Sequence, residues 1–119
     1  MSAVHHRVLC CGGRDFNDYA FLTARLNELR QVIGDFAVIH GGARGADSLA
    51  TLWGKAHGLP VIEVAANWGF YNKAAGHIRN TWMLDFCFPT YAVAFPGGTG
   101  TANMVRQCEN RSVVVWRLA

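Results

Sequence analysis

The stretch Phe36-Ala-Val-Ile-His-Gly-Gly-Ala-Arg-Gly-Ala-Asp47 leads from an apolar run through a glycine-rich loop into the start of an amphipathic pattern. The four apolar residues at 36–39 predict a buried strand, and the glycines from Gly41 to Gly45 predict a tight turn. Beyond the turn, apolar residues recur at steps of three and four, which predicts a helix from about Ala46 to His57. This stretch is therefore one strand–loop–helix unit.

The same unit recurs along the chain, with strands expected at 7–11, 36–39, 60–64, 91–95 and 112–116, and helices at about 18–33, 46–57, 71–85 and after 101. Strands joined by helices run parallel, and their continuously apolar character indicates a sheet covered on both faces. The pattern predicts an α/β fold: a Rossmann-like, doubly wound, mostly parallel five-stranded sheet in the order 3-2-1-4-5, with helices on both faces. One domain accounts for residues 1–119.

Composition excludes several classes of protein. Half of the 119 residues are hydrophobic (51%) and 16% are charged, which excludes intrinsic disorder. The net charge of +3 is too small to argue for nucleic acid, which we therefore do not expect as a partner. We find no apolar run long enough for a signal peptide or a membrane span. The four cysteines lack C-x-x-C spacing, so we expect reduced thiols, a cytoplasmic protein, and neither metal nor cofactor.

Three glycine-rich loops each follow a predicted strand and precede a predicted helix. In the 3-2-1-4-5 order these strands are neighbours, and ligands of such sheets bind at the carboxyl edge where the strand order reverses. Glycine lets the backbone approach a ligand, and helix N-termini present N–H groups that suit phosphate. The expected phosphate-binding residues are Gly12, Gly13, Arg14, Gly41, Gly42, Ala43, Arg44, Gly45, Pro96, Gly97, Gly98, Thr99, Gly100 and Thr101.

The alternative interpretation is that the glycines only make tight turns between strand and helix. Neither a Walker A loop nor a G-x-G-x-x-G dinucleotide fingerprint is present, which argues against an ordinary NTPase or dehydrogenase.

Four blocks of sequence resemble the SLOG superfamily, and most closely its small YpsA-related branch. They are Gly12-Gly-Arg-Asp-Phe16, His40-Gly-Gly-Ala-Arg-Gly-Ala-Asp47, Lys73-Ala-Ala-Gly-His-Ile-Arg-Asn80 and Pro96-Gly-Gly-Thr-Gly-Thr-Ala-Asn-Met104. The superfamily includes the Lonely Guy phosphoribohydrolases and the DNA-processing protein A. The resemblance implies a Rossmann-like fold and a site for nucleotides or their derivatives.

The chain departs from its relatives at two positions. The Lonely Guy enzymes use a glutamate where this chain has Met104, so the resemblance carries over the fold and not the hydrolase activity. His77 stands where relatives commonly carry proline; it either reaches the ligand or is a solvated histidine at a helix end.

Several side chains outside the glycine loops are candidates for the site. Arg79, beside Asn80, either reaches a phosphate or is a surface arginine. Asp15 and Asp47 are the candidate catalytic bases, with helix capping or ribose binding as alternatives for Asp47. Other candidates adjoin the third helix, either as ligand contacts or as plain surface and hydrophobic cover: Lys73, Trp68, Phe70 and Tyr71.

Three functions remain open from the sequence. The first is binding or sensing of a nucleotide-derived small molecule, such as a nucleoside phosphate or an ADP-ribose-like compound. The second is a nucleotide hydrolase that cleaves an N-glycosidic or phosphate bond, and the third is single-stranded DNA binding. We also expect a homodimer or higher homo-oligomer, because apolar residues gather around Trp82, Met83 and Phe86.

Overall fold

The computed structural model describes residues 6–66, 69 and 74–118, and its centre is a five-stranded, all-parallel sheet. The strands lie in the order β3-β2-β1-β4-β5, which confirms the topology predicted from the sequence. Their bounds are β1 His6–Cys11, β2 Phe36–His40, β3 Val61–Glu63, β4 Tyr91–Ala94 and β5 Val114–Arg117.

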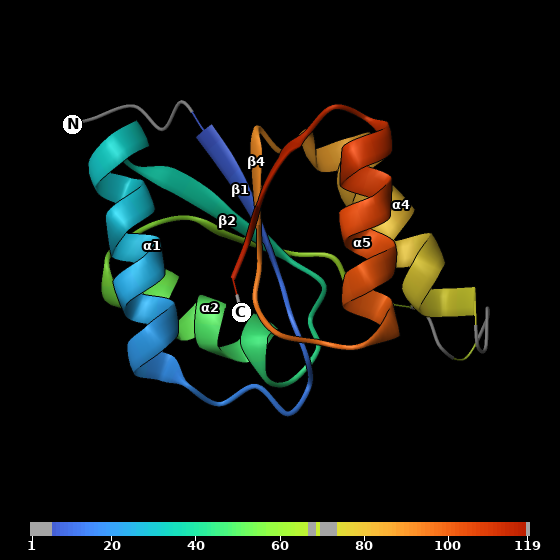
Figure 1. Cartoon of the computed structure of the whole chain (residues 1–119), viewed down its shortest axis with the longest axis horizontal. Helices are drawn as coiled ribbons and strands as arrows, with labels where there is room; N and C mark the ends of the chain where they lie inside the picture. Colours follow the sequence, from blue (N-terminus) through green and yellow to red (C-terminus); the bar gives the residue numbers. More distant parts are fainter. Residues whose placement is uncertain (1–5, 67–68, 70–73, 119) are drawn as a thin grey trace.

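Helices cover both faces of the sheet, as Figure 1 shows. α1 (Tyr19–Ile33) and α2 (Ala46–Ala56) lie on one side, and α4 (Ala75–Cys87) and α5 (Thr99–Asn110) on the other. Strand β1 supplies both cores alternately, because successive side chains of a strand point to opposite faces. Val8 and Cys10 pack with the first helix pair, and Leu9 and Cys11 with the second.

Two predicted boundaries were wrong. Helix α5 begins at Thr99, inside the stretch expected to be a loop, with Gly98 at its N-cap. Strand β5 begins at Val114, because Ser112 adopts a positive φ of 60° and Val113 N–H donates to Cys108 O at 2.9 Å, so both residues close the end of α5. Residues 70–73, where the third helix was expected to begin, lie outside the described residues.

The three glycine loops meet at the carboxyl edge of the sheet. Strand β1 pairs with β2 on one side and β4 on the other, so the loops after these strands are neighbours. Gly13 N–H donates to Pro96 O at 2.8 Å, and Ala46 N–H donates to Gly13 O at 3.2 Å. The first loop is therefore hydrogen-bonded to the third loop and to the end of the second. None of the described helices combines the length and apolar character needed to cross a bilayer.

Candidate functional site

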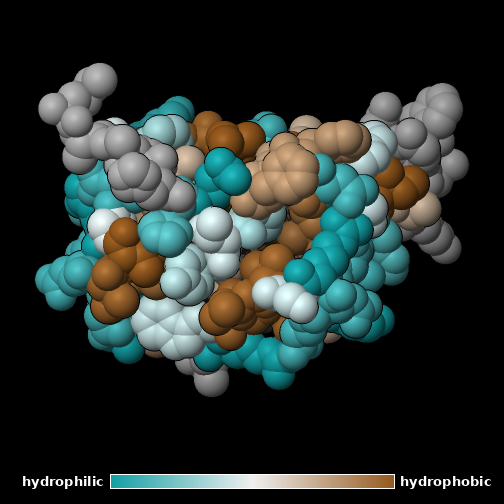
Figure 2. Space-filling view, turned by 90° about the horizontal axis from the view of Figure 1, so that it is seen from above, coloured by the Kyte–Doolittle hydropathy of each residue, from teal (hydrophilic) through white to brown (hydrophobic). Residues whose placement is uncertain are grey.

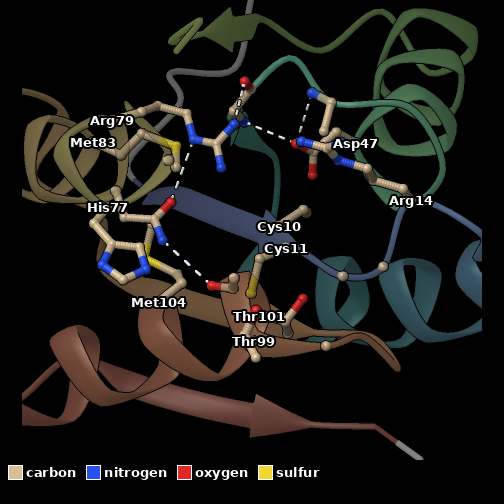
Figure 3. Close-up of a pocket in the computed structure, with 18 residues that line it drawn as sticks. Cys10, Cys11, Arg14, Asp47, His77, Arg79, Met83, Thr99, Thr101 and Met104 are labelled. Atoms are coloured by element: carbon tan, nitrogen blue, oxygen red, sulfur yellow. Dashed lines mark hydrogen bonds between the residues drawn. The ribbon is translucent and has the colours of Figure 1, made fainter. Parts of the chain in front are cut away.

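A cavity of about 410 Å³ opens at this carboxyl edge (Figure 3). Most of the residues that the sequence predicts for the site line it, and they come from the loops after β1, β2 and β4, the first turns of α2 and α5, and the second turn of α4. The predicted residues in the lining are Gly12, Gly13, Arg14, Gly41, Ala43, Asp47, Arg79, Asn80, Gly98, Thr99, Gly100 and Thr101.

Other predicted site residues do not line the cavity: Asp15, Gly42, Arg44, Gly45, Pro96 and Gly97. Asp15 and Arg44 are exposed. Gly45 has a positive φ of 80°, and a Cβ there would collide with the Gly13 carbonyl, so this glycine allows the loops to pack together. The candidates Trp68, Phe70, Tyr71 and Lys73 lie outside the described residues.

Asp47 holds the second glycine loop in shape. Its Oδ2 accepts hydrogen bonds from Gly41 N–H at 3.2 Å and Ala43 N–H at 3.1 Å. It makes no side-chain cap at the start of α2, so the capping role considered from the sequence is wrong. Burial raises the pKa of this carboxyl above its ordinary value, although the two N–H groups oppose the shift.

His40 holds the same loop from the other side, and sequence reasoning missed this role. Gly42 N–H donates to His40 Nδ1 at 2.9 Å, and His40 Nε2 bonds the Thr51 hydroxyl. An Nδ1 that accepts leaves the neutral ring with its proton on Nε2. Burial lowers the pKa of this imidazole. The amides of this loop that were expected to bind phosphate, from Gly41 to Ala43, therefore donate within the protein.

Arg79 lies across the cavity from α2, half-buried against the second loop (Figure 3). Its Nη1 donates to Gly41 O at 3.0 Å, and its Nε donates to Asn80 Oδ1 at 3.4 Å. A Cβ at Gly41 would come within 2.7 Å of the Arg79 side chain, so the glycine makes room for the guanidinium. Burial lowers the pKa of this group, and the charge of Arg14 adds to the effect.

The first turn of α5 forms the opposite wall. The N–H groups of a helix's first turn have no partner within the helix, and here they belong to Thr99, Gly100 and Thr101. Gly100 is helical, and a Cβ at this position would meet no atom within 4 Å. Gly100 does not adopt a positive φ and a Cβ there would strike no neighbour, so neither backbone conformation nor packing requires a glycine at this position.

A chain of amide side chains fixes α4 against α5 beside the cavity. Asn80 is buried, and its Nδ2 donates to Gly100 O at 3.3 Å and Asn103 Oδ1 at 3.0 Å. Gln107 Nε2 donates to the same Asn103 oxygen at 2.9 Å. Met104 is buried and lines the cavity with a thioether.

The rest of the cavity wall contains four sulfur side chains, which the sequence patterns did not assign to the site: Cys10, Cys11, Met83 and Met104. All four are buried, and both cysteines are free thiols, as expected. Burial raises the pKa of both thiols far above the ordinary value, so they are neutral and unreactive. The cavity thus has an apolar, polarisable floor between cationic and amide-rich walls. Within the described residues, no cluster of three or more His, Cys, Asp or Glu could hold a metal ion.

Two comparisons find known sequences that are similar to this chain, one over its first part and one over most of its length. The model of the YspA, cpYpsA-related SLOG family matches residues 6–71, which include the first two glycine loops. The Gene 61 protein of Mycobacterium phage D29 is 33% identical over 121 residues, covering 92% of this chain and 93% of that protein.

Proposed function

Since this chain belongs to the YspA, cpYpsA-related SLOG family, we propose that its cavity binds a nucleotide-derived small molecule, such as a nucleoside phosphate or an ADP-ribose-like compound. Family membership indicates a nucleotide-related function in general. The cavity supports the finer proposal because it combines what such a ligand needs. Arg14 and Arg79 provide charge for a phosphate, and the sulfur-lined floor provides an apolar surface for a flat base.

Gly100 is the single observation on which this proposal most depends. It lies in the first turn of α5, lines the cavity and has open space where a side chain would be. A phosphate oxygen that approaches the N–H groups of this turn would use that space. The adjacent hydroxyls of Thr99 and Thr101 also line the cavity and could donate to the same group.

Titration calorimetry tests the proposal with AMP, ADP-ribose and the unphosphorylated control adenosine. We expect both phosphorylated compounds to bind more tightly than adenosine, because the two arginines and the α5 N-terminus interact with the phosphate. If no phosphorylated compound binds at millimolar concentration, the proposal is wrong.

Hydrolysis of the bound nucleotide is a second candidate function, and Asp47 favours it. Of the two carboxylates proposed as bases, Asp47 lines the cavity and Asp15 does not. Burial raises the pKa of Asp47, and a raised pKa makes a carboxylate a better base. Incubation with AMP, NAD and ADP-ribose, followed by detection of released base, tests this function. Asp47→Asn keeps an oxygen for the loop amides but should abolish turnover; undiminished turnover would exclude Asp47 as the base.

We also propose that the chain forms a homodimer through the exposed end of α4. Phe86 is 72% exposed and Phe88 65%, and large exposed apolar side chains mark protein contacts. Figure 2 shows apolar side chains among hydrophilic ones on the face seen from above. Met83 is buried in the cavity wall, so it does not belong to this surface, contrary to expectation. Light scattering at tens of micromolar should give the dimer mass for the native chain and the monomer mass for Phe86→Asp; a monomeric native chain would contradict the proposal.

A further inference from the structure

His77 lies at the mouth of the cavity and has no part in the function proposed so far. It is in the first turn of α4, exposed, and lines the cavity. Figure 3 shows its ring beside Met104, across the cavity from Arg14 and Asp47. Its carbonyl oxygen accepts from Thr81 Oγ1 at 3.1 Å and Gln107 Nε2 at 3.5 Å, which fixes this position to both α4 and α5.

The net charge of the cavity lining is one unit short of balancing a doubly negative ligand. The described lining contains two guanidinium groups, those of Arg14 and Arg79, and the carboxyl group of Asp47, so with this carboxyl ionised it carries one net positive charge. The Cys10 and Cys11 thiols are neutral, and the first turn of α5 contains no acidic residue. A phosphomonoester carries about two negative charges near neutral pH. Protonation of His77 would make the charge of the lining equal and opposite to that of the ligand.

A bound anion favours the charged form of a nearby imidazole. We propose that His77 couples ligand binding to proton uptake, so that the cavity takes a dianionic phosphate or pyrophosphate compound together with one proton from solvent. This inference rests on the proposed function. It narrows the ligand class to dianions, in preference to monoanions such as cyclic nucleotides.

Calorimetry with ADP-ribose and inorganic sulfate tests this coupling, because both probes keep a charge of about two throughout the range from pH 6 to 8. Titrations in two buffers of different ionisation enthalpy report the protons taken up on binding. We expect uptake by the native chain near pH 7, and affinity about tenfold higher at pH 6 than at pH 8, as for a hydrogen bond that becomes charged.

The variant His77→Gln removes the charge but keeps a side chain that forms hydrogen bonds. We expect it to bind at pH 6 about as weakly as the native chain binds at pH 8, with the proton uptake due to His77 lost. His6→Gln is the matched control, because His6 lies at the start of β1 and bonds Thr90 Oγ1. It should behave as the native chain does. Asp47 and His40 remain in every variant, so their own titration cancels in the comparison.

Two outcomes separate this inference from the function on which it rests. If the native chain binds a probe but His77→Gln shows the same proton uptake and the same ratio of affinities, the coupling through His77 is wrong. If neither probe nor AMP binds the native chain at either pH, the proposed function itself is wrong. Circular dichroism melting of His77→Gln confirms that the variant is folded in both cases.

Discussion

The glycines of the three loops are present for different physical reasons, and the structure distinguishes these reasons. Gly45 allows one loop to pack on another, and Gly41 leaves room for Arg79. Gly100 has neither reason, since it is helical and adjoins open space. The sequence predicted all of them as ligand contacts, because spacing alone cannot tell a glycine required by packing from one required by a ligand.

Replacing Gly100 with alanine should therefore stabilise the free protein and weaken ligand binding. Alanine favours the helix by about 0.5–1 kcal/mol, and urea unfolding measures that gain. The added methyl group should clash with the bound ligand, which costs roughly 1–3 kcal/mol, or about fivefold to 150-fold in affinity. Ala102→Ser, two residues further along α5 and outside this cavity lining, is the control: it should leave the affinity unchanged and lower stability by about a few tenths of a kcal/mol. If the Gly100 variant binds with unchanged affinity, this turn does not contact the ligand.

Among the elements, the predictions were best where hydrophobic periodicity and caps agree. Helix α1 begins after Asp18, whose side chain accepts from Phe21 N–H at 3.0 Å, and it ends before Gly34, much as predicted. The second loop was predicted in position but not in mechanism. Its amides are occupied by His40 and Asp47, and only the folded arrangement places these two side chains against the loop.

The pH dependence of stability follows from His40. Because burial lowers its folded pKa, the unfolded chain binds a proton at a pH where the folded chain does not. The free energy of unfolding should therefore fall as the pH drops below about 6.5, the ordinary histidine value. Charges from three elements face this ring: Asp47 on α2, Glu63 on β3 and Arg79 on α4.

Urea unfolding at about pH 7.5 and 5.5 measures this decline, and His40→Gln supplies the comparison. The variant should be less stable at pH 7.5 by about 1 kcal/mol, the value of one hydrogen bond, but should lose less stability on acidification. The raised pKa of Asp47 acts in the opposite direction, and it is present in both proteins. Equal declines in the two proteins would show that His40 does not cause the acid sensitivity.

At the scale of the whole molecule, the strand order and the two-layered core followed from the sequence. The alternating contributions of β1 to two cores explain why the run Val8 to Cys11 is apolar without interruption. The sulfur-lined floor was not predicted as part of the site. Its members come from β1, α4 and α5, so only the tertiary fold brings Cys11, Met83 and Met104 to one cavity.

The cavity exists only when both helix layers are folded, so a ligand should bind the folded chain and not the unfolded one. Binding should therefore raise the melting temperature. At a hundred times the dissociation constant the gain is about 2.7 kcal/mol, or roughly 10 °C for a domain of this size. Arg79→Ala should melt a few degrees lower without ligand, because it loses the hydrogen bond to Gly41 O, but it should show a much smaller increase with AMP or ADP-ribose. Differential scanning calorimetry measures both. If the ligand raises the melting temperature of Arg79→Ala as much as that of the native chain, Arg79 does not bind the ligand.

The contact between the Gly45 position and the Gly13 carbonyl, described above, also decides where the molecule can be engineered. With no spare volume between these loops, neither can be lengthened, tagged or exchanged on its own without displacing the other. The turns at Gly34 and Gly58 are different, since an added Cβ would meet no atom within 4 Å at either one. Both glycines have a positive φ, 84° and 67°, and should be kept, so fluorescent reporters or fused domains belong beside them, where they would leave the binding end of the scaffold intact.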